Sequence, residues 1–395
     1  MTKTKPPAIV TTESALAETC AQLAAADAFA FDTEFVGEDS YEPEICLVQV
    51  ATERFCAVLD PLAGLDLSPL WRFMADTSQR VIVHAGAEDV AVCARHAGKL
   101  PKNVFDLQVA AGFVGLDYPI SLSRLAKAVV GAVLHKSQTL TDWRRRPLTQ
   151  EQIRYAAGDV LHLPAICRSL TERLAESGRL EWAEEESGRV CAQATATGEN
   201  GQKLRRLRGT GGLSSRQLAI VDALLEEREK LAAQYNRPPR AVLRDHLLVE
   251  IARHGLTDVQ KIKALRGVNL NAAAVRRLAG AGGRAGEAPI GRKHPPPPDE
   301  DTPEEQLLVA LATAVLRSYA GREGIAYSLL AAKSDLRTFI RSYTRSRAAE
   351  HPILLKTGWR KAAVGGLLDR VLSGSCRVRV IHEDGTYRLD IETPG

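Results

Sequence analysis

The sequence lacks the features of an exported, membrane-spanning or disulfide-bonded protein. No apolar run follows the first seven residues, so we expect no secretory signal, and no stretch approaches the length of a transmembrane helix. Its seven cysteines are an odd number and include no C-x-x-C pair, which argues against a structural zinc site. Most of them lie in apolar segments, as small core residues do in a reducing environment. We therefore predict a cytoplasmic protein without membrane association.

The composition is that of a globular chain large enough for more than one domain. With 395 residues, of which 45% are apolar and 25% charged, the chain can form two or three domains with their own cores. Its charge is unevenly distributed: residues 1–200 hold 19 Lys and Arg against 27 Asp and Glu, and residues 201–395 hold 33 against 21. Balances of −8 and +12 suggest an acidic part that does metal chemistry and a basic part that holds a polyanion. A drift in surface composition would give the same counts.

Strand and helix patterns alternate over about the first 180 residues, which is typical of an α/β domain. Three strand patterns joined by short turns come first, and alternating helices and strands follow. This order resembles that of a ribonuclease H-like sheet. The expected strands are 28–35, 45–51, 54–59 and 81–84, and the expected helices are 12–25, 88–95, 107–115, 122–129 and 149–176, the last with a break at Pro164.

The rest of the chain is expected to be helical, with two linkers. The predicted order is an α/β domain (1–186), a basic linker (187–212), a helical domain (213–280), a Pro/Gly-rich linker (281–300) and a second helical domain ending in a β-hairpin (301–395). The segment 328–336 weakly resembles 241–247, which suggests that the second helical domain is a divergent copy of the first. The aperiodic linker suggests that the tail beyond residue 200 folds independently of the α/β domain.

Four acidic residues and one tyrosine occur among apolar neighbours in three short segments. They are Asp32 and Glu34 in FDTEF, Asp89 in VHAGAEDV, and Tyr155 and Asp159 in YAAGDV. Alternate residues of a strand share a face, so Asp32 and Glu34 project together. Residues four apart on a helix also share a face, which places Tyr155 beside Asp159. Buried carboxylates are rare unless they are paired or bind a metal, so their convergence would require divalent cations.

Such a cluster indicates metal-assisted cleavage of phosphodiester bonds. Carboxylate oxygens suit Mg²⁺ or Mn²⁺ better than zinc. Two such ions about 4 Å apart can activate a water molecule and stabilise the leaving 3′-oxygen. A tyrosine hydroxyl, with an ordinary pKa near ~10, is a poor base but can orient that water. Each segment alone is common in unrelated proteins, whereas all three in this order point to a nuclease.

The three segments resemble the exonuclease motifs of the DEDD 3′→5′ exonucleases, in the branch that carries a tyrosine. Residues 136–148 and the helical regions behind the nuclease resemble the ribonuclease D family, with one or two HRDC (helicase and RNase D C-terminal) domains. The nuclease resemblance covers about residues 10–185. It implies a ribonuclease H-like fold and two divalent cations, Mg²⁺ or Mn²⁺, bound by Asp32, Glu34, Asp89 and Asp159, with Tyr155 as a further catalytic residue. It also implies release of 5′-mononucleotides from the 3′-hydroxyl ends of RNA, tRNA precursors included. We expect a monomer.

Six further residues are candidates for RNA contact: His84, Lys136, Gln138, Trp143, Arg144 and Arg146. The last five belong to a basic stretch with one aromatic residue, which suits phosphate contact and base stacking at a single-stranded end. A solvated basic loop would look the same. His84 ends a buried strand, a position that favours a structural role in the core. Its place in the second motif leaves open a role beside the site.

Two other functions remain open at this stage. The same acidic set serves DNA 3′→5′ exonucleases, and nothing in the acidic motifs recognises a 2′-hydroxyl group. The chain could also be a nucleic-acid-binding scaffold without activity. That alternative predicts the loss of at least one carboxylate, and all four are present.

Overall fold

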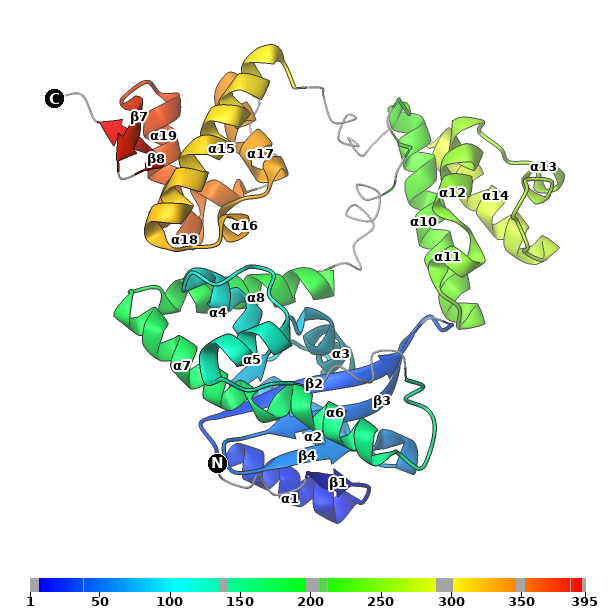
Figure 1. Ribbon diagram of the computed structural model, residues 1–395. Coiled ribbons are helices and arrows are strands. Elements are labelled where there is room, and N and C mark those ends of the chain that lie inside the picture. Colours follow the sequence, from blue (N-terminus) through cyan, green and yellow to red (C-terminus); the bar gives the residue numbers. More distant parts are fainter. Residues whose placement is uncertain are drawn as a thin grey trace.

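The computed structural model describes residues 7–37, 39–134, 141–196, 207, 209–210, 212–288, 301–345, 352–383 and 385–392. The chain forms an α/β domain and two helical domains (Figure 1). None of the described helices is long and apolar enough to cross a membrane.

A six-stranded mixed sheet forms the centre of the α/β domain, with the order β1-β4-β3-β2-β5-β6. The strands are β1 (Ala8–Val10), β2 (Ala28–Val36), β3 (Glu44–Ala51), β4 (Cys56–Leu59), β5 (Arg80–Val83) and β6 (Val104–Asp106). β2, β3 and β4 form an antiparallel meander, and β5 and β6 continue parallel to β2. This arrangement confirms the predicted ribonuclease H-like sheet. The sequence patterns missed β1 and β6, because three residues are too few to show a strand periodicity.

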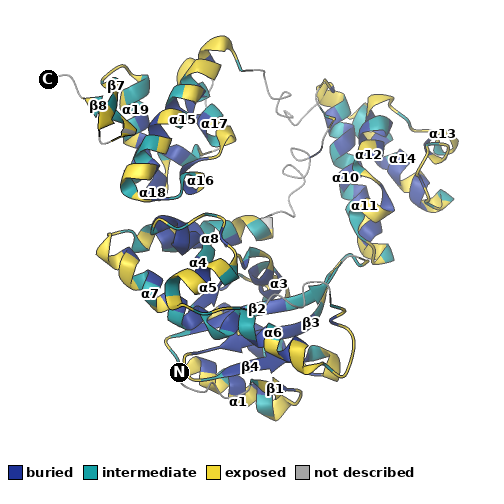
Figure 2. Cartoon of the chain, in the orientation of Figure 1, coloured by how far each residue is buried: buried dark blue, intermediate teal, exposed yellow. Residues whose placement is uncertain are grey.

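Helices cover both faces of this sheet, and the buried residues lie between the layers (Figure 2). The helices are α1 (Glu13–Ala24), α2 (Ser68–Asp76), α3 (Ala87–Ala97), α4 (Leu107–Phe113), α5 (Leu122–Val130), α6 (Gln150–Leu161), α7 (Leu163–Glu176) and α8 (Leu180–Ala196). Helices α1, α2 and α3 share a core with Phe29 and Phe31, whereas α6 and α7 share a core with Ala30 and Leu47 on the opposite face. The break expected at Pro164 lies at His162, so Pro164 occupies the first turn of α7.

The predicted start of the linker at residue 187 is wrong, because α8 continues to Ala196. Ser187 is fully buried, and its hydroxyl donates to the carbonyl of Ala183 (2.7 Å) and accepts from the backbone N–H of Asp106 (3.1 Å). The polar composition of this segment resembles a linker, but these polar groups are paired inside the domain.

The first helical domain has its own hydrophobic core. It consists of α10 (Ser215–Tyr235), α11 (Pro239–Val242), α12 (Asp245–Arg253), α13 (Val259–Lys263) and α14 (Ala272–Glu287). It contacts the α/β domain through Tyr41, which follows β2 and packs against this core. The backbone N–H of Tyr41 donates to Oδ1 of Asn236, 3.1 Å away, just beyond the end of α10.

The second helical domain repeats this order of elements. It contains α15 (Pro303–Glu323), α16 (Tyr327–Leu330), α17 (Lys333–Thr344), η2 (Leu354–Lys356), α18 (Gly358–Arg360), η3 (Lys361–Gly365) and α19 (Gly366–Leu372). Helices α10 and α15 both have 21 residues, begin with a capping box and precede a four-residue helix. The two domains thus begin with similar elements, and the divergent repeat stays a prediction. The predicted terminal hairpin is present as β7 (Arg377–Glu383) and β8 (Thr386–Glu392).

The expectation that the whole tail folds independently is wrong for this second helical domain, which shares a core with the α/β domain. The ring of Trp359 packs against Phe113 and Trp182, with centroids 4.8 and 5.7 Å apart. Nearby, the Arg360 guanidinium donates to both oxygens of Glu186, at 2.6 and 2.8 Å, and both side chains are buried. Sequence patterns missed this interface because apolar periodicity does not reveal which domain a helix packs against.

Candidate active site

Three of the predicted acidic residues converge above the sheet. Strand β2 presents Asp32 and Glu34 on one face, and α6 crosses that face with Asp159. One carboxylate oxygen of each residue lies within 4.8 Å of those of the other two. The start of α6 is fixed by a capping box, in which the N–H of Gln152 donates to the Thr149 hydroxyl and the Gln152 side chain accepts from the Thr149 N–H. The geometry thus brings together residues that are more than 120 positions apart in the sequence.

The fourth carboxylate, Asp89, reaches β2 from the other side. It lies in the first turn of α3 and is buried. Its Oδ1 accepts hydrogen bonds from the backbone N–H of Thr33, at 3.1 Å, and from the Thr33 hydroxyl. Because Thr33 lies between Asp32 and Glu34, Asp89 is fixed next to the other acids. Sequence analysis missed this role of Thr33, although a threonine that alternates with two acids on a buried strand is a signal that could have shown it.

A tight turn between β5 and α3 positions Asp89. Ala85 has a φ of 54°, a left-handed conformation that is unfavourable for a residue with a Cβ. Gly86 follows, and a Cβ at that position would lie 2.5 Å from the Cβ of Val83. The buried carboxylate of Asp106 accepts from the N–H of Ala85 (3.0 Å) and that of Gln108 (2.8 Å), so it ties this turn to the start of α4. Asp106 is a second positioning residue that the sequence patterns missed.

The electrostatics of the cluster favour cation binding. Burial, followed by the charges of Asp89, Asp159 and Glu34, raises the pKa of Asp32 well above its ordinary value. Burial also raises the pKa of Glu34 to about 8 and that of Asp159 to about 7. The raised pKa values mean that the charged carboxylates are unfavourable here without a compensating positive charge. An oxygen-only donor set of this kind fits a hard divalent cation.

Tyr155 lies one helical turn before Asp159 and is partly buried. Burial and the nearby charges of Asp159, Glu34 and Asp32 raise the pKa of its hydroxyl to about 12. The hydroxyl is therefore protonated at neutral pH and can donate a hydrogen bond. The ring of Trp143 lies 6.0 Å from that of Tyr155 and is itself buried, so Trp143 packs behind Tyr155. This placement favours support of the tyrosine over base stacking as the role of Trp143.

The structure separates the other candidate RNA contacts. Lys136 and Gln138 lie outside the described residues. The Nε2–H of His84 donates to the carbonyl of Ile120, 3.0 Å away, and burial lowers the pKa of His84 to about 4, so it is neutral at pH 7. Arg144 pairs with Glu44 at the surface, at 2.7 Å. Arg146 forms a bidentate pair with the buried Asp60, at 2.6 and 2.7 Å, which commits its guanidinium to the fold.

A carboxylate pair on the central strand of a ribonuclease H-like sheet, opposite a helix that brings a third carboxylate and a tyrosine, defines the class of metal-dependent 3′→5′ exonucleases. Comparison with known proteins agrees. Residues 7–175 match the family model described as 3′-5′ exonuclease, and residues 217–275 match that of the HRDC domain.

The chain is also similar, over most of its length, to known proteins of one family. It is 33% identical to ribonuclease D of Acidiphilium cryptum, over 84% of this chain and 85% of the relative, and 33% identical to ribonuclease D of a Jannaschia species, over 93% and 96%. The crystal structure of Escherichia coli RNase D, described as an exoribonuclease involved in structured RNA processing, has a TM-score of 0.81 at 26% identity and covers 94% of this chain and 99% of that one. The chain belongs to the ribonuclease D family. It is a 3′→5′ exoribonuclease whose nuclease domain uses divalent metal ions.

Proposed function

We propose that this enzyme removes 5′-mononucleotides one at a time from the 3′-hydroxyl ends of RNA, tRNA precursors included. Asp32, Glu34 and Asp159 hold two divalent cations, Mg²⁺ or Mn²⁺, with Asp89 completing the site. The observation that supports this most directly is the set of three carboxylates within 4.8 Å of one another, whose pKa values are raised by burial and mutual repulsion. When bound, the cations activate the attacking water and stabilise the leaving 3′-oxygen.

The protein's own groups orient the reaction. The protonated hydroxyl of Tyr155 donates a hydrogen bond to the attacking water and aligns it with the scissile phosphate. Thr33 holds the Asp89 carboxylate in one orientation, so the fourth ligand needs little rearrangement when a cation binds. A terminal 3′-phosphate would add about −2 charge beside the carboxylates and is expected to be excluded.

The proposed substrate and setting rest on the relatives and on the side chains. The Escherichia coli relative processes structured RNA, which supports RNA 3′ ends as the substrate of this chain. All seven cysteines are free thiols and five are buried, which supports the proposed cytoplasmic location. We also propose that the enzyme acts as a monomer, since one chain supplies all four carboxylates and the tyrosine.

End-labelled oligomers test this function directly. An RNA with a free 3′-hydroxyl should be shortened stepwise in Mg²⁺ or Mn²⁺ and remain intact in EDTA. The same RNA with a 3′-phosphate should be cut far more slowly, and a circular RNA should be resistant. Faster digestion of the matched DNA would instead identify a DNA exonuclease. No digestion of either polymer with any cation would indicate a binding scaffold.

A further inference from the structure

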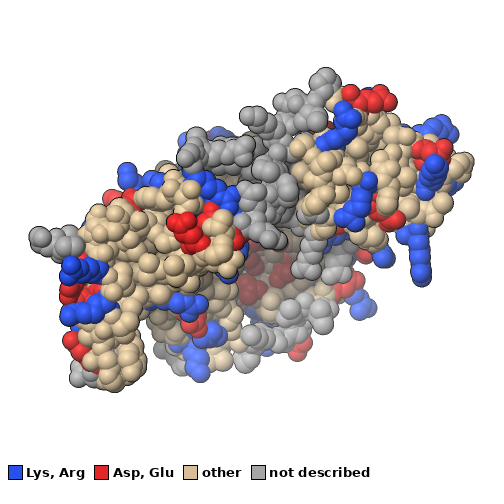
Figure 3. Space-filling model, turned by 90° about the horizontal axis from the view of Figure 1, so that it is seen from above, with Lys and Arg blue, Asp and Glu red and all other residues tan. Residues whose placement is uncertain are grey.

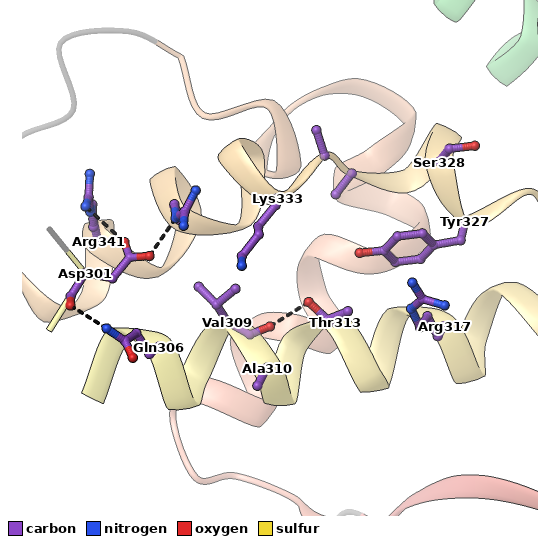
Figure 4. Close-up of a pocket in the computed structure, with 13 residues that line it drawn as sticks. Asp301, Gln306, Val309, Ala310, Thr313, Arg317, Tyr327, Ser328, Lys333 and Arg341 are labelled. Atoms are coloured by element: carbon purple, nitrogen blue, oxygen red, sulfur yellow. Dashed lines mark hydrogen bonds and ion pairs between the residues drawn. The ribbon is translucent and has the colours of Figure 1, made fainter. Parts of the chain in front are cut away.

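The second helical domain contains a groove that the nuclease chemistry does not use. It lies between α15 and the segment that runs from α16 into α17, and it has a volume of about 1200 Å³. Figure 4 shows side chains from both walls pointing into it, among them Lys333 and the hydroxyl of Tyr327.

Positive charge dominates this groove. Arg317, Lys333, Arg337 and Arg341 line it, whereas Asp301 is its acidic residue. Asp301 pairs with Arg337 at 2.6 Å and Arg341 at 3.0 Å, as the dashed lines of Figure 4 show at one end of the groove. Arg317 and Lys333 are exposed, and within the described parts of the chain neither forms an ion pair. On the face of the helical domains seen in Figure 3, acidic side chains are interspersed with the basic ones.

The groove also contains a cation–π pair. The guanidinium carbon of Arg317 lies over the Tyr327 ring, 4.9 Å from its centre, so the guanidinium covers one face of the ring. Arginine and aromatic planes are the surfaces on which unpaired bases stack, and neighbouring cations contact the phosphates of the same strand. A simple anion site would need the charges but not the aromatic ring.

One short loop connects this groove with the active site. At the groove wall, the Ser328 hydroxyl donates to the carbonyl of Tyr118, 2.7 Å away. Two residues further on, the carbonyl of Ile120 contacts Nε2 of His84 at 3.0 Å. His84 directly precedes the turn that positions Asp89. The loop between α4 and α5 thus contacts both the groove wall and the residue that precedes the Asp89 turn.

We propose that this groove binds the single-stranded RNA segment that lies upstream of the 3′ end in the active site. The inference rests on the proposed function, because it takes RNA as the ligand. Arg317, which lies over the Tyr327 ring, stacks on a base, and Lys333 contacts a phosphate. The domain then serves to hold longer substrates, while very short oligomers need only the nuclease site.

Paired substitutions in the full-length chain test this assignment. The groove variant carries Arg317→Ala and Lys333→Ala, and the matched control carries Lys361→Ala and Arg370→Ala, two exposed cations of the same domain that do not line the groove. Binding of a labelled single-stranded RNA of about twelve nucleotides is measured by fluorescence anisotropy in EDTA over a salt series. The groove variant should bind roughly tenfold more weakly, with a log–log salt slope smaller by about 0.7, the single-strand value for the one phosphate contact of Lys333, whereas the control should match the wild type.

Hydrolysis of a trinucleotide separates this inference from the proposed function. The groove variant should cut it at the wild-type rate, because both substituted residues lie outside the nuclease site. If the wild type itself cuts no RNA, the proposed function fails. If the wild type cuts RNA but the groove variant and the control bind the longer RNA with equal affinity and equal salt slopes, the groove assignment is overturned, and an acidic protein partner becomes the better explanation of its charge. Charge reversal (Arg317→Glu with Lys333→Glu) should weaken binding more than alanine does, and equal effects of the two changes would also contradict the assignment.

Discussion

Gln49 lies directly opposite Asp32 in the antiparallel ladder of β2 and β3. Directly opposed residues share a face, so the Gln49 side chain lies beside the acidic cluster, beneath α6. It is fully buried, and neither its amide oxygen nor its amide nitrogen has a hydrogen-bond partner among the described residues. An unpaired buried polar group lowers the free energy of unfolding by about 1–3 kcal/mol. Its presence next to the acidic cluster suggests that it serves the site rather than the stability of the fold.

Gln49→Met should therefore raise the stability of the metal-free protein. Methionine has a similar volume, so the change removes an unpaired amide without opening a cavity, and a gain of about 1 kcal/mol is expected. The same change should lower turnover, because it removes a polar group that lies directly opposite Asp32 on the face of the sheet that carries the acidic cluster. Thermal unfolding in EDTA and hydrolysis of a short RNA measure the two effects. A loss of stability would show instead that the amide already has a partner.

Asp32→Asn and Asp159→Asn should each abolish hydrolysis while leaving the fold intact. Each change removes a negatively charged ligand but preserves size and shape. Because it also relieves repulsion among the carboxylates, the metal-free variants should be at least as stable as the wild type. Turnover and unfolding curves test the two statements separately. A variant with a substantial fraction of wild-type turnover would refute the assignment of that residue as a metal ligand.

Sequence patterns predicted the parts of this structure that depend on local order. Alternation along β2 predicted that Asp32 and Glu34 share a face, and helical spacing predicted that Tyr155 lies next to Asp159. The patterns could not show that Thr33 fixes Asp89 or that Asp106 ties the Ala85 turn to α4, because those contacts depend on how distant elements pack. The basic stretch around Arg146 was ambiguous for the same reason: its buried partner, Asp60, is 86 residues away in the sequence.

The metal-free enzyme should lose stability as the pH rises from about 5 to 9. In the folded protein the pKa of Glu34 is about 8 and that of Asp159 about 7, both above the ordinary values of about 4. A raised pKa means that folding favours the protonated form, so this contribution is complete below the ordinary pKa and disappears as the pH passes the folded value. Unfolding midpoints in EDTA should fall by several degrees over this range, and saturating Mg²⁺ should flatten the profile. A midpoint in EDTA that rises with pH would contradict the repulsion inferred for this cluster.

Tyr155→Phe should reduce kcat about 10²-fold and change KM little. The ring and its packing against Trp143 remain, while the hydroxyl that we propose as the donor to the attacking water is lost. Steady-state kinetics on a short RNA separate the two constants. An increase in KM alone would identify Tyr155 as a substrate contact.

Arg360→Met should destabilise the α/β domain although Arg360 belongs to another domain. The substitution leaves Glu186 buried with one of its two arginine partners removed, and breaking a buried pair in this way costs about 3 kcal/mol. Burial alone would raise the pKa of Glu186, but hydrogen bonds from Arg189 and Arg360 lower it to about 2. This lowered pKa stabilises the wild type above about pH 4.5, and the contribution is lost as the pH falls toward 2.

The variant should consequently unfold at a lower temperature at pH 7 and differ less from the wild type at pH 3. Arg370→Met, which changes an exposed arginine of the same domain, is the matched control and should leave the midpoint unchanged.

Because Phe113 and Trp182 pack against Trp359, removal of residues 301–395 should have a still larger effect and yield a nuclease domain that aggregates. A fragment of residues 1–300 with the wild-type unfolding midpoint would show that the shared core contributes little to the stability of the nuclease.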